Sequence, residues 1–310
     1  MDNAEIIVGV DGSPQADAAV RWAASRAQHT GARLRLLHAY VVPVPAPAMP
    51  LATANAYDVD PQGYTVEAGE AVLAAASTVA HNHASGIDVI TDLRAGGAAP
   101  VLIDASTEAD LIVLGSRGLG GFAGLLLGSV STQVSGHAHC PTIVVHGQAH
   151  AAGPVVVGVD GSEPAAAAAA FAFTEASRLG TGVIAVHAWS LPLPTGPAEA
   201  VAVAMASGDD QIRYQQGARH ILTDALADCR RQHPDVPVHE RLTEAGAAEA
   251  LLEAAAEPAL IAVGSRGHGG FTGLLLGSTS HAVLHHASCP VAVVRADQAT
   301  DRDLGRDSSS

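Results

Sequence analysis

The feature that most constrains the fold of this chain is an internal repeat with a period of 149 residues. The segment Ile7–Ser13 returns as Val156–Ser162, and Cys140–Val145 returns as Cys289–Val294. Solenoid repeats are much shorter, about 20–50 residues, so a period of this length indicates a duplicated domain. The chain has 310 residues, which is enough for two domains that each bury a core.

The predicted domain limits follow from this repeat. We place the first domain at residues 1–147, a linker at 148–153 and the second domain at 154–295. The linker is small and polar and carries no hydrophobic periodicity. Residues 296–310 are polar and end in three serines, which predicts a disordered tail.

The amino-acid composition bears on where the protein is located in the cell and on what it can bind. Hydrophobic residues make up 48% of the chain, yet Gly, Pro, His or Asp interrupts every apolar run before about 18 residues, so we expect no transmembrane helix. The acidic N-terminus lacks a basic region before an apolar stretch, which argues against a secretory signal. Cys140, Cys229 and Cys289 are too few for a disulfide framework and fit a reducing cytoplasm. The net charge of −15 makes nucleic-acid and membrane-surface binding unfavourable.

Short apolar runs alternate with helical patterns in each copy. The runs lack period-2 alternation, as expected of strands buried on both faces of a parallel sheet. In the first copy the expected strands are Ile6–Val10, Leu34–Ala39, Ile87–Leu93, Leu111–Gly115 and Thr142–His146, and the expected helices are Gln15–His29, Val66–His83, Ala98–Thr107 and Ser129–Ala138. We predict an α/β fold of two tandem, doubly wound, Rossmann-like domains, each with a five-stranded parallel sheet of order 3-2-1-4-5 flanked by helices.

Two further sequence features concern the residues at which helices start and the stretches that interrupt the alternation of strands and helices. We expect Ser13 or Asp11 to cap the first helix and Ser129 to mark the start of the last helix of the first copy. Pro43–Pro50 interrupts the alternation, and Leu191–Pro197 does so in the second copy. Two interpretations stay open, a variable surface excursion or a flap over a site.

The glycine-rich segments Gly115–Ser129 and Gly264–Ser278 contain the strongest functional signal. In doubly wound sheets ligands bind beyond the carboxyl ends of the strands where the strand order reverses, here between strands one and four. Asp11–Ser13 and the start of the first glycine segment leave those two strands. Glycines let several amide N–H groups point at one anion, and the helix that opens after Gly128 adds a positive dipole end. The sequence therefore predicts a phosphate site.

Two residues at this site have more than one interpretation. Ser129 could cap its own helix or donate to a phosphate oxygen. Asp11 is unsuited to phosphate, so its expected partners are a ribose or base donor or a magnesium ion, although it could instead cap a helix. The segment is not a Walker A loop, because it lacks the Lys-Ser/Thr ending, and its spacing is not that of a dinucleotide fingerprint.

The spacing is Gly-x2-Gly-x9-Gly-Ser, present in both copies. Together with Val-Gly-Val-Asp-Gly-Ser at the start and His-Ala-x-Cys-Pro before the last strand of each copy, this pattern resembles the universal stress protein family in its tandem, ATP-binding form. The resemblance covers residues 4–295.

This resemblance implies one ATP site per domain, with Mg2+ as an optional companion ion. In the first copy the implied contacts are Gly9, Asp11, Ala39, Leu114, Gly115, Arg117, Gly118, Gly128, Ser129 and Val130. In the second copy they are Gly158, Asp160, Ala188, Val263, Gly264, Arg266, Gly267, Gly277, Ser278 and Thr279. Ala39 and Ala188 replace a more usual valine, and Val130 differs from Thr279, so the two sites could be unequal.

Several arginines, histidines and cysteines could have either a structural or a functional role. Arg117 and Arg266 are either phosphate or partner contacts or solvated loop arginines. His137 and Cys140 lie three residues apart, as do His286 and Cys289, but we find no Cys-x2-Cys or His-x3-His partner pair that completes a zinc set, so we predict no metal site. We expect the cysteines to be packing residues, and His38 and His187 to be hydrogen-bonded core residues and not bases.

The predicted function is a cytoplasmic, ATP-binding regulator of a stress or dormancy response. Nucleotide would shift the protein between states read by an unknown protein partner. No residue near the loops has the character of a dedicated general base, so we predict no enzyme and at most slow ATP hydrolysis. The alternatives are an adenine-nucleotide-consuming enzyme of the α-hydrolase-like group, a cyclic-AMP binder, and a nucleotide-independent scaffold. The resemblance also implies intrachain pairing of the two domains through their last strands, and whole chains could form a homodimer.

Overall fold

The computed structural model describes residues 4–41, 61–119, 127–147, 150, 152–189, 208–267 and 276–296. The chain divides into two compact units, Met1–Val145 and His146–Ser310. Each unit is an α/β domain with a parallel sheet, which confirms the predicted fold class. The proline-containing stretches 43–50 and 191–197 lie outside the described residues, as does residue 297 onward.

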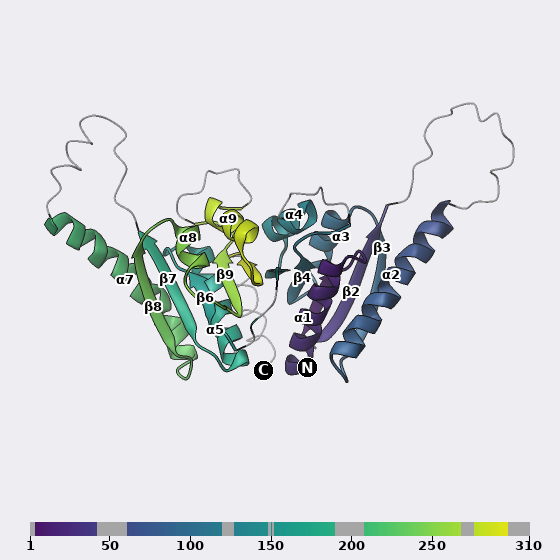
Figure 1. Cartoon of the computed structure of the whole chain (residues 1–310), viewed down its shortest axis with the longest axis horizontal. Coiled ribbons are helices and arrows are strands. Elements are labelled where there is room, and N and C mark those ends of the chain that lie inside the picture. The colour runs from purple at the N-terminus through teal and green to yellow at the C-terminus, as the bar shows by residue number, and fades with distance from the viewer. Residues whose placement is uncertain are drawn as a thin grey trace, which may run out of the picture. The chain divides into compact units, whose positions relative to one another are not determined.

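The first unit alternates strands and helices along the chain (Figure 1). Its elements are β1 (Glu5–Gly9), α1 (Pro14–Thr30), β2 (Arg33–Tyr40), α2 (Pro61–His83), β3 (Val89–Ala95), α3 (Ala98–Ala105), β4 (Leu111–Gly115), α4 (Ser129–His137) and β5 (Thr142–Val145). Neighbouring strands are parallel in the order β3-β2-β1-β4-β5, as predicted. The order reverses between β1 and β4, where Ile7 pairs with Ile112.

The second unit repeats this arrangement. Its elements are β6 (Val155–Gly158), α5 (Glu163–Leu179), β7 (Val183–Trp189), α7 (Gly208–Gln232), β8 (Val238–Glu244), α8 (Ala247–Leu252), β9 (Leu260–Gly264), α9 (Ser278–His286) and β10 (Val291–Val294). The parallel order is β8-β7-β6-β9-β10, so the reversal lies between β6 and β9.

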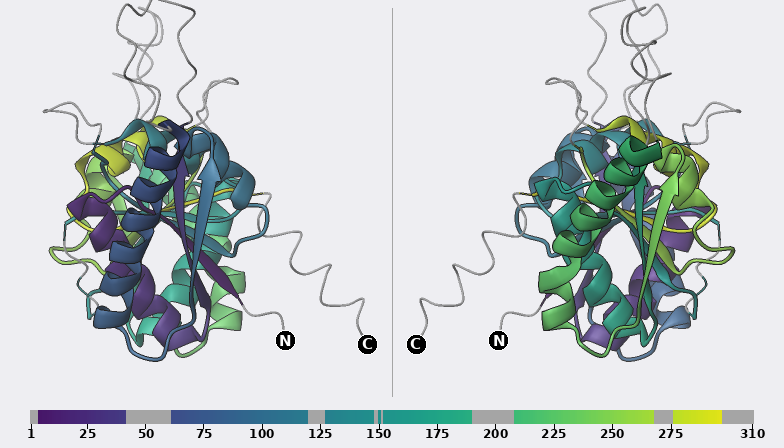
Figure 2. Two further views of the ribbon diagram at one scale, coloured as in Figure 1. Left: turned by 90° about the vertical axis from the view of Figure 1, so that its right-hand side faces the viewer. Right: turned by 90° about the vertical axis from the view of Figure 1, so that its left-hand side faces the viewer.

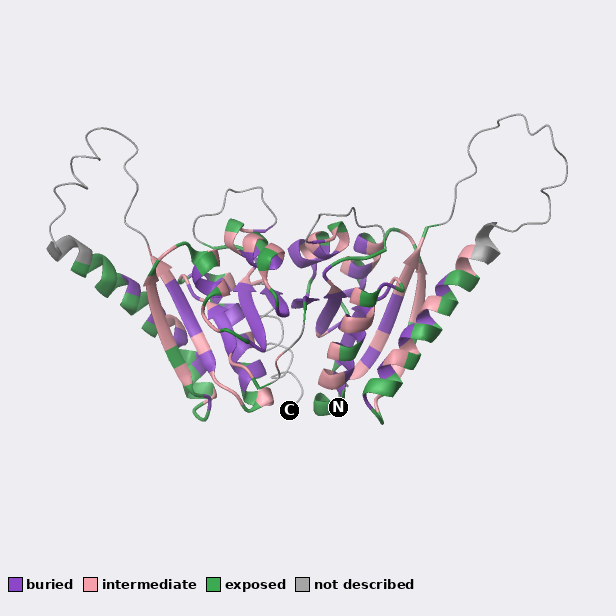
Figure 3. Cartoon of the chain, in the orientation of Figure 1, coloured by how far each residue is buried: buried purple, intermediate pink, exposed green. Residues whose placement is uncertain are grey.

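Helices cover both faces of each sheet. In the first unit α1 packs on α2, and α3 packs on α4 against the other face. The left view of Figure 2 shows α2 alongside the edge strand β3. Successive residues of a strand point to opposite faces of the sheet, so each face has its own core. On the face covered by α3, the strand residues Ile7, Leu37 and Ile112 pack with Leu102 and Val134. The central strands are buried along most of their length (Figure 3), which explains their continuous apolar sequences.

Helix ends agree with the sequence signals except at one position. The Ser13 hydroxyl caps α1 by accepting from the Ala16 N–H at 3.1 Å, so Ser13 and not Asp11 is the cap. The expected helix start at Ser129 is confirmed, whereas the interpretation of Ser129 as the N-cap of this helix is wrong. Gly128 is the N-cap, Ser129 is the first helical residue, and no side chain caps this end. The Gly128 N–H donates instead to the Ser116 carbonyl at 2.8 Å, which fixes where the helix begins.

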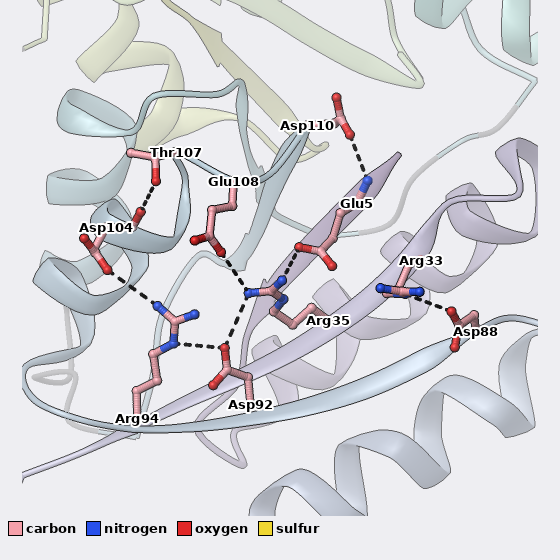
Figure 4. Close-up of polar contacts among 10 residues, drawn as sticks. All are labelled: Glu5, Arg33, Arg35, Asp88, Asp92, Arg94, Asp104, Thr107, Glu108 and Asp110. Carbon is pink, nitrogen blue, oxygen red and sulfur yellow. Dashed lines mark hydrogen bonds and ion pairs between the residues drawn. The ribbon is translucent and has the colours of Figure 1, made fainter. Parts of the chain in front are cut away.

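A group of ion pairs crosses one face of the first sheet (Figure 4). Arg35 on β2 contacts Glu5 at 2.6 Å, Asp92 at 3.6 Å and Glu108 at 3.5 Å. The Arg35 side chain is only 17% exposed, so these carboxylates neutralise a largely buried cation. The second unit carries Ile184 at the equivalent place in the repeat, so this cluster distinguishes the two units.

Candidate functional site

Each unit has a cavity at the carboxyl ends of its strands, at the point where the strand order reverses. The first cavity has a volume of about 470 Å³ and the second about 200 Å³. All ten residues predicted for the first site line the first cavity, and all ten predicted for the second line the second. The structure therefore brings each predicted set together within one unit.

Main-chain and histidine hydrogen bonds position the acidic residue of the first cavity. The Val10 N–H donates to the Leu37 carbonyl at 2.9 Å, and the His38 Nδ1–H donates to the Val10 carbonyl at 2.7 Å. Both bonds hold the chain just before Asp11. In the second unit His187 is buried and donates in the same way to the Val159 carbonyl at 2.6 Å. The expected hydrogen-bonded role of these two histidines is confirmed.

The Asp11 carboxylate joins two segments that are far apart in the sequence. Its Oδ1 accepts from the Ser13 N–H at 3.0 Å, and its Oδ2 accepts from the Leu119 N–H at 2.8 Å. The loop after β1 is thereby bonded to the loop after β4. In the second unit Asp160 Oδ1 accepts from the Ser162 N–H at 3.0 Å and from the Ser162 hydroxyl at 2.6 Å.

The glycines of the cavity have separate spatial roles. A Cβ atom on Gly115 would lie 2.8 Å from the Gln15 carbonyl oxygen, so this glycine lets β4 approach the start of α1. A Cβ on Gly118 would lie 2.2 Å from Asp11 Oδ2, so the second glycine makes room for the carboxylate. Gly267 has the same 2.2 Å relation to Asp160.

The N-terminus of α4 forms one wall of the cavity. Ser129, Val130 and Ser131 line it, and the N-cap Gly128 offers no side chain to their amides. The Ser131 hydroxyl donates to the Gly115 carbonyl at 2.7 Å, which ties the helix to the end of β4. An uncapped helix N-terminus leaves N–H groups and a partial positive charge available to an anion.

The second cavity has the same wall. Gly277 caps α9 without a side chain, and Ser278 and Thr279 line the cavity. The Ser280 hydroxyl donates to the Gly264 carbonyl at 2.5 Å.

Several lining residues were missed by sequence reasoning. The first cavity also has apolar walls from Leu37, Leu102 and Leu127, and the second from Val186 and Leu251. The spacing of Ala98 and Leu102, one helical turn apart, gave a signal for α3, but nothing local indicated that this face meets the cavity. Arg117 and Arg266 are exposed at the cavity edge.

The remaining reactive side chains lie apart from the cavities. Cys140, Cys229 and Cys289 are buried and form no disulfide bond, as expected of packing residues. Burial raises the pKa of the Cys289 thiol to about 11. Within the described ranges no group of three or more His, Cys, Asp and Glu side chains could hold a metal ion. No helix in the described part of the chain is long and apolar enough to cross a membrane.

Comparison with known proteins agrees with this geometry. The profile of the universal stress protein family matches twice, at residues 3–146 and 152–295. The chain therefore belongs to the universal stress protein family, and it has the tandem form. A universal stress protein of Mycolicibacterium smegmatis is 40% identical over 296 residues, which cover 94% of this chain and 96% of that protein. One from Mycobacterium tuberculosis strain H37Rv is 38% identical over 298 residues, with the same two coverages.

Solved structures show the same fold. The crystal structure of a universal stress protein from Archaeoglobus fulgidus superimposes with a TM-score of 0.65 at 21% identity, covering 96% of this chain and all of that one (100%). A universal stress protein solved in complex with cAMP is 27% identical and covers 46% of this chain and 97% of that chain, with a TM-score of 0.35. The latter superposition carries no argument about the ligand of this chain.

Proposed function

We propose that each unit binds one ATP molecule in its cavity and that the bound nucleotide shifts the protein between states read by a protein partner. The observation that carries this proposal is the uncapped N-terminus of α4 beside a cavity whose acidic residue is already bonded to the glycine segment. Helix N-termini of this kind favour phosphate. The first cavity, at about 470 Å³, also lies within the range of about 300–1,000 Å³ typical of small-molecule sites.

The lining of the first cavity offers contacts for the phosphates and for the nucleoside of a nucleotide. The amides of Ser129 and Val130 and the exposed Arg117 supply donors and positive charge for phosphates. Elsewhere in the lining, Gly9 and Ala39 leave room for a flat base, and Asp11 offers its carboxylate to ribose or base donors. Each Asp11 oxygen accepts one main-chain N–H and still has capacity for a further donor.

This arrangement favours binding over turnover. Among the described residues that line the first cavity, Asp11 is the one carboxylate, and both of its oxygens hold backbone N–H groups. No lysine lines the described part of the cavity to neutralise the transferring phosphate. We therefore assign no catalytic residue, expect at most slow hydrolysis, and place Mg2+, where it accompanies ATP, on the phosphates.

Calorimetry with the full chain tests the nucleotide sites. ATP should bind with a stoichiometry of two per chain, and mass spectrometry of the purified protein should identify adenine nucleotide. Arg117→Glu should weaken the first site by about tenfold or more, because it replaces a charge-assisted contact with repulsion. Arg21→Glu is the matched control, since Arg21 is exposed on α1 and lies outside the cavity lining.

Each outcome separates the alternatives. Absence of ATP binding at millimolar concentration refutes the proposal and leaves a nucleotide-independent scaffold. Tight cAMP binding with weak ATP binding assigns the cavity to the cyclic nucleotide. The proposed change of state on nucleotide binding is measured by amide hydrogen exchange with and without ATP. Protection should increase at Leu119 and in the first turn of α4, and unchanged exchange would show binding without switching.

A further inference from the structure

Two histidines of α9 are held differently from other helical histidines of the chain. His29, His81 and His137 each donate from Nδ1 to the carbonyl four residues earlier, at 2.6, 2.8 and 2.8 Å. The rings of His281 and His285 instead lie beside each other, with centroids 4.4 Å apart and planes inclined by 36°. No hydrogen bond from another described residue occupies either ring.

We propose that His281 and His285 form a bidentate binding site for a divalent first-row transition-metal ion, with Zn2+ as the representative ligand. Residues four apart lie on one face of a helix, so both imidazoles reach the same point in solvent. Imidazole nitrogen suits Zn2+, Cu2+ and Ni2+. The helix backbone fixes both Cα positions before the ion arrives, so chelation requires only rotation of the two neighbouring side chains, which limits its ordering cost.

The surroundings leave this pair accessible. His281 is exposed and His285 is half-buried, and neither lines the cavity of the second unit. The ring of His286 lies 6.4 Å from that of His285, on the neighbouring helical position, and therefore projects in another direction. Two imidazoles leave the other positions of a tetrahedral Zn2+ to water, so we expect weaker binding than at a four-ligand structural site.

The first unit lacks this pair. The equivalent positions of α4 are Thr132 and Gly136, which cannot chelate in this way. The expected zinc site therefore belongs to the second unit alone. The sequence-based prediction of no metal site looked for a partner pair to complete a zinc set at the His and Cys residues near the helix ends, and it did not consider His281 and His285 as a pair by themselves.

Metal binding at this pair has a structural consequence. An ion bridging His281 and His285 would clamp one turn of α9, and the first turn of α9 lines the second cavity. We expect Zn2+ to raise the unfolding temperature of the chain, because a ligand that binds only the folded state stabilises it.

Calorimetric titration of the full chain with ZnCl2 tests the site. Compared with the wild type, H281A and H285A should each lose one bound Zn2+ per chain, or bind it about tenfold or more weakly, because the second imidazole acts intramolecularly. H286A and H137A are matched controls on the same helix and on its counterpart, and both should retain the wild-type isotherm. Zinc bound elsewhere appears equally in all five proteins and cancels in the comparison.

Two results overturn the proposal. One is an H281A variant that binds Zn2+ like the wild type. The other is an H286A variant that loses as much binding as H281A, because this would indicate general histidine binding. His281 is exposed, so H281A keeps the test valid even if H285A unfolds. Circular dichroism without metal checks that each variant is folded.

Discussion

Substituting Gly118 with alanine is the most direct perturbation of the first cavity. The added Cβ would lie 2.2 Å from Asp11 Oδ2, far inside van der Waals contact. Gly118 is not among the described glycines with positive φ, so alanine meets no backbone strain there. The cost of the substitution is therefore the displacement of the Asp11 carboxylate.

The magnitude follows from the hydrogen bonds that the carboxylate must give up. Moving Oδ2 breaks its bond to the Leu119 N–H, which is 2.8 Å long. A hydrogen bond to a charged group contributes about 1.5–3 kcal/mol, and the exposure of Leu119 favours the lower end. We expect the first unit to lose about 1.5 kcal/mol, which corresponds to a fall in its unfolding temperature of about 3–6 °C.

Two assays measure this prediction. Thermal unfolding followed by circular dichroism gives the loss of stability, and calorimetry with ATP gives the affinity of each site. Gly118→Ala should weaken the first site by about tenfold or more, equivalent to about 1.4 kcal/mol of binding free energy, because the displaced Asp11 carboxylate no longer meets the nucleotide in its original position. The second site should be unchanged. Gly267→Ala should give the reverse pattern, because Gly267 has the same distance to Asp160.

A double-mutant cycle decides whether Asp11 is the cause. In an Asp11→Ala background no carboxylate remains to be displaced, so Gly118→Ala should cost little further stability. If Gly118→Ala is equally destabilising with and without the Asp11 carboxylate, the steric argument is wrong. If Gly118→Ala binds two ATP per chain with wild-type affinities, the cavity is not the nucleotide site.

Three further predictions test a helix cap, an ion-pair cluster and a buried thiol of the fold. Ser13→Ala should lower the free energy of unfolding by about 1 kcal/mol through loss of an N-cap, whereas Ser129→Ala should leave it nearly unchanged because Ser129 caps nothing; urea unfolding measures both. Arg35→Leu should cost about 3 kcal/mol in the same assay, since it leaves the largely buried Glu5 carboxylate without its cation, and an unchanged midpoint would contradict this. Cys289 should resist iodoacetamide at pH 8 until urea is added, as mass spectrometry would show, because its pKa is about 11 and it is buried. The raised pKa also means that the unfolded thiol ionises first, so this thiol's contribution to stability should fall as the pH rises from about 9 toward 11.

Much of the fold could be predicted from the sequence because its signals are local. Buried parallel strands appear as continuous apolar runs, and the helix start at Ser13 is marked by a side chain that can accept a hydrogen bond. The start of α4 at Ser129 was predicted correctly, but its N-cap was placed one residue late for a non-local reason. Both Gly128 and Ser129 can precede a helix, and the choice is made by the bond from Gly128 to Ser116 across the glycine segment.

The position of the site could also be predicted, but the roles of its glycines could not. The rule for doubly wound sheets places the cavity at the β1 and β4 ends without any knowledge of side chains. The need for glycine at 115 comes from the Gln15 carbonyl, and the need for glycine at 118 comes from Asp11. These contacts join residues about a hundred positions apart, so no local pattern encodes them.

The comparison of the two units indicates which part of the chain is functional. Around both cavities the same contacts recur, namely the histidine bond to the loop after the first strand, the serine bond to the last residue of the fourth strand, and the close approach of glycine to aspartate. Away from the cavities the units have diverged, as at Arg35 and Ile184 on the sheet and at His281 and Thr132 on the last helix. A sheet of this type folds with either set of outer residues. It does not need an aspartate that fits against a glycine two loops away, so the presence of this pair in both copies supports the proposal that both cavities bind the same class of ligand.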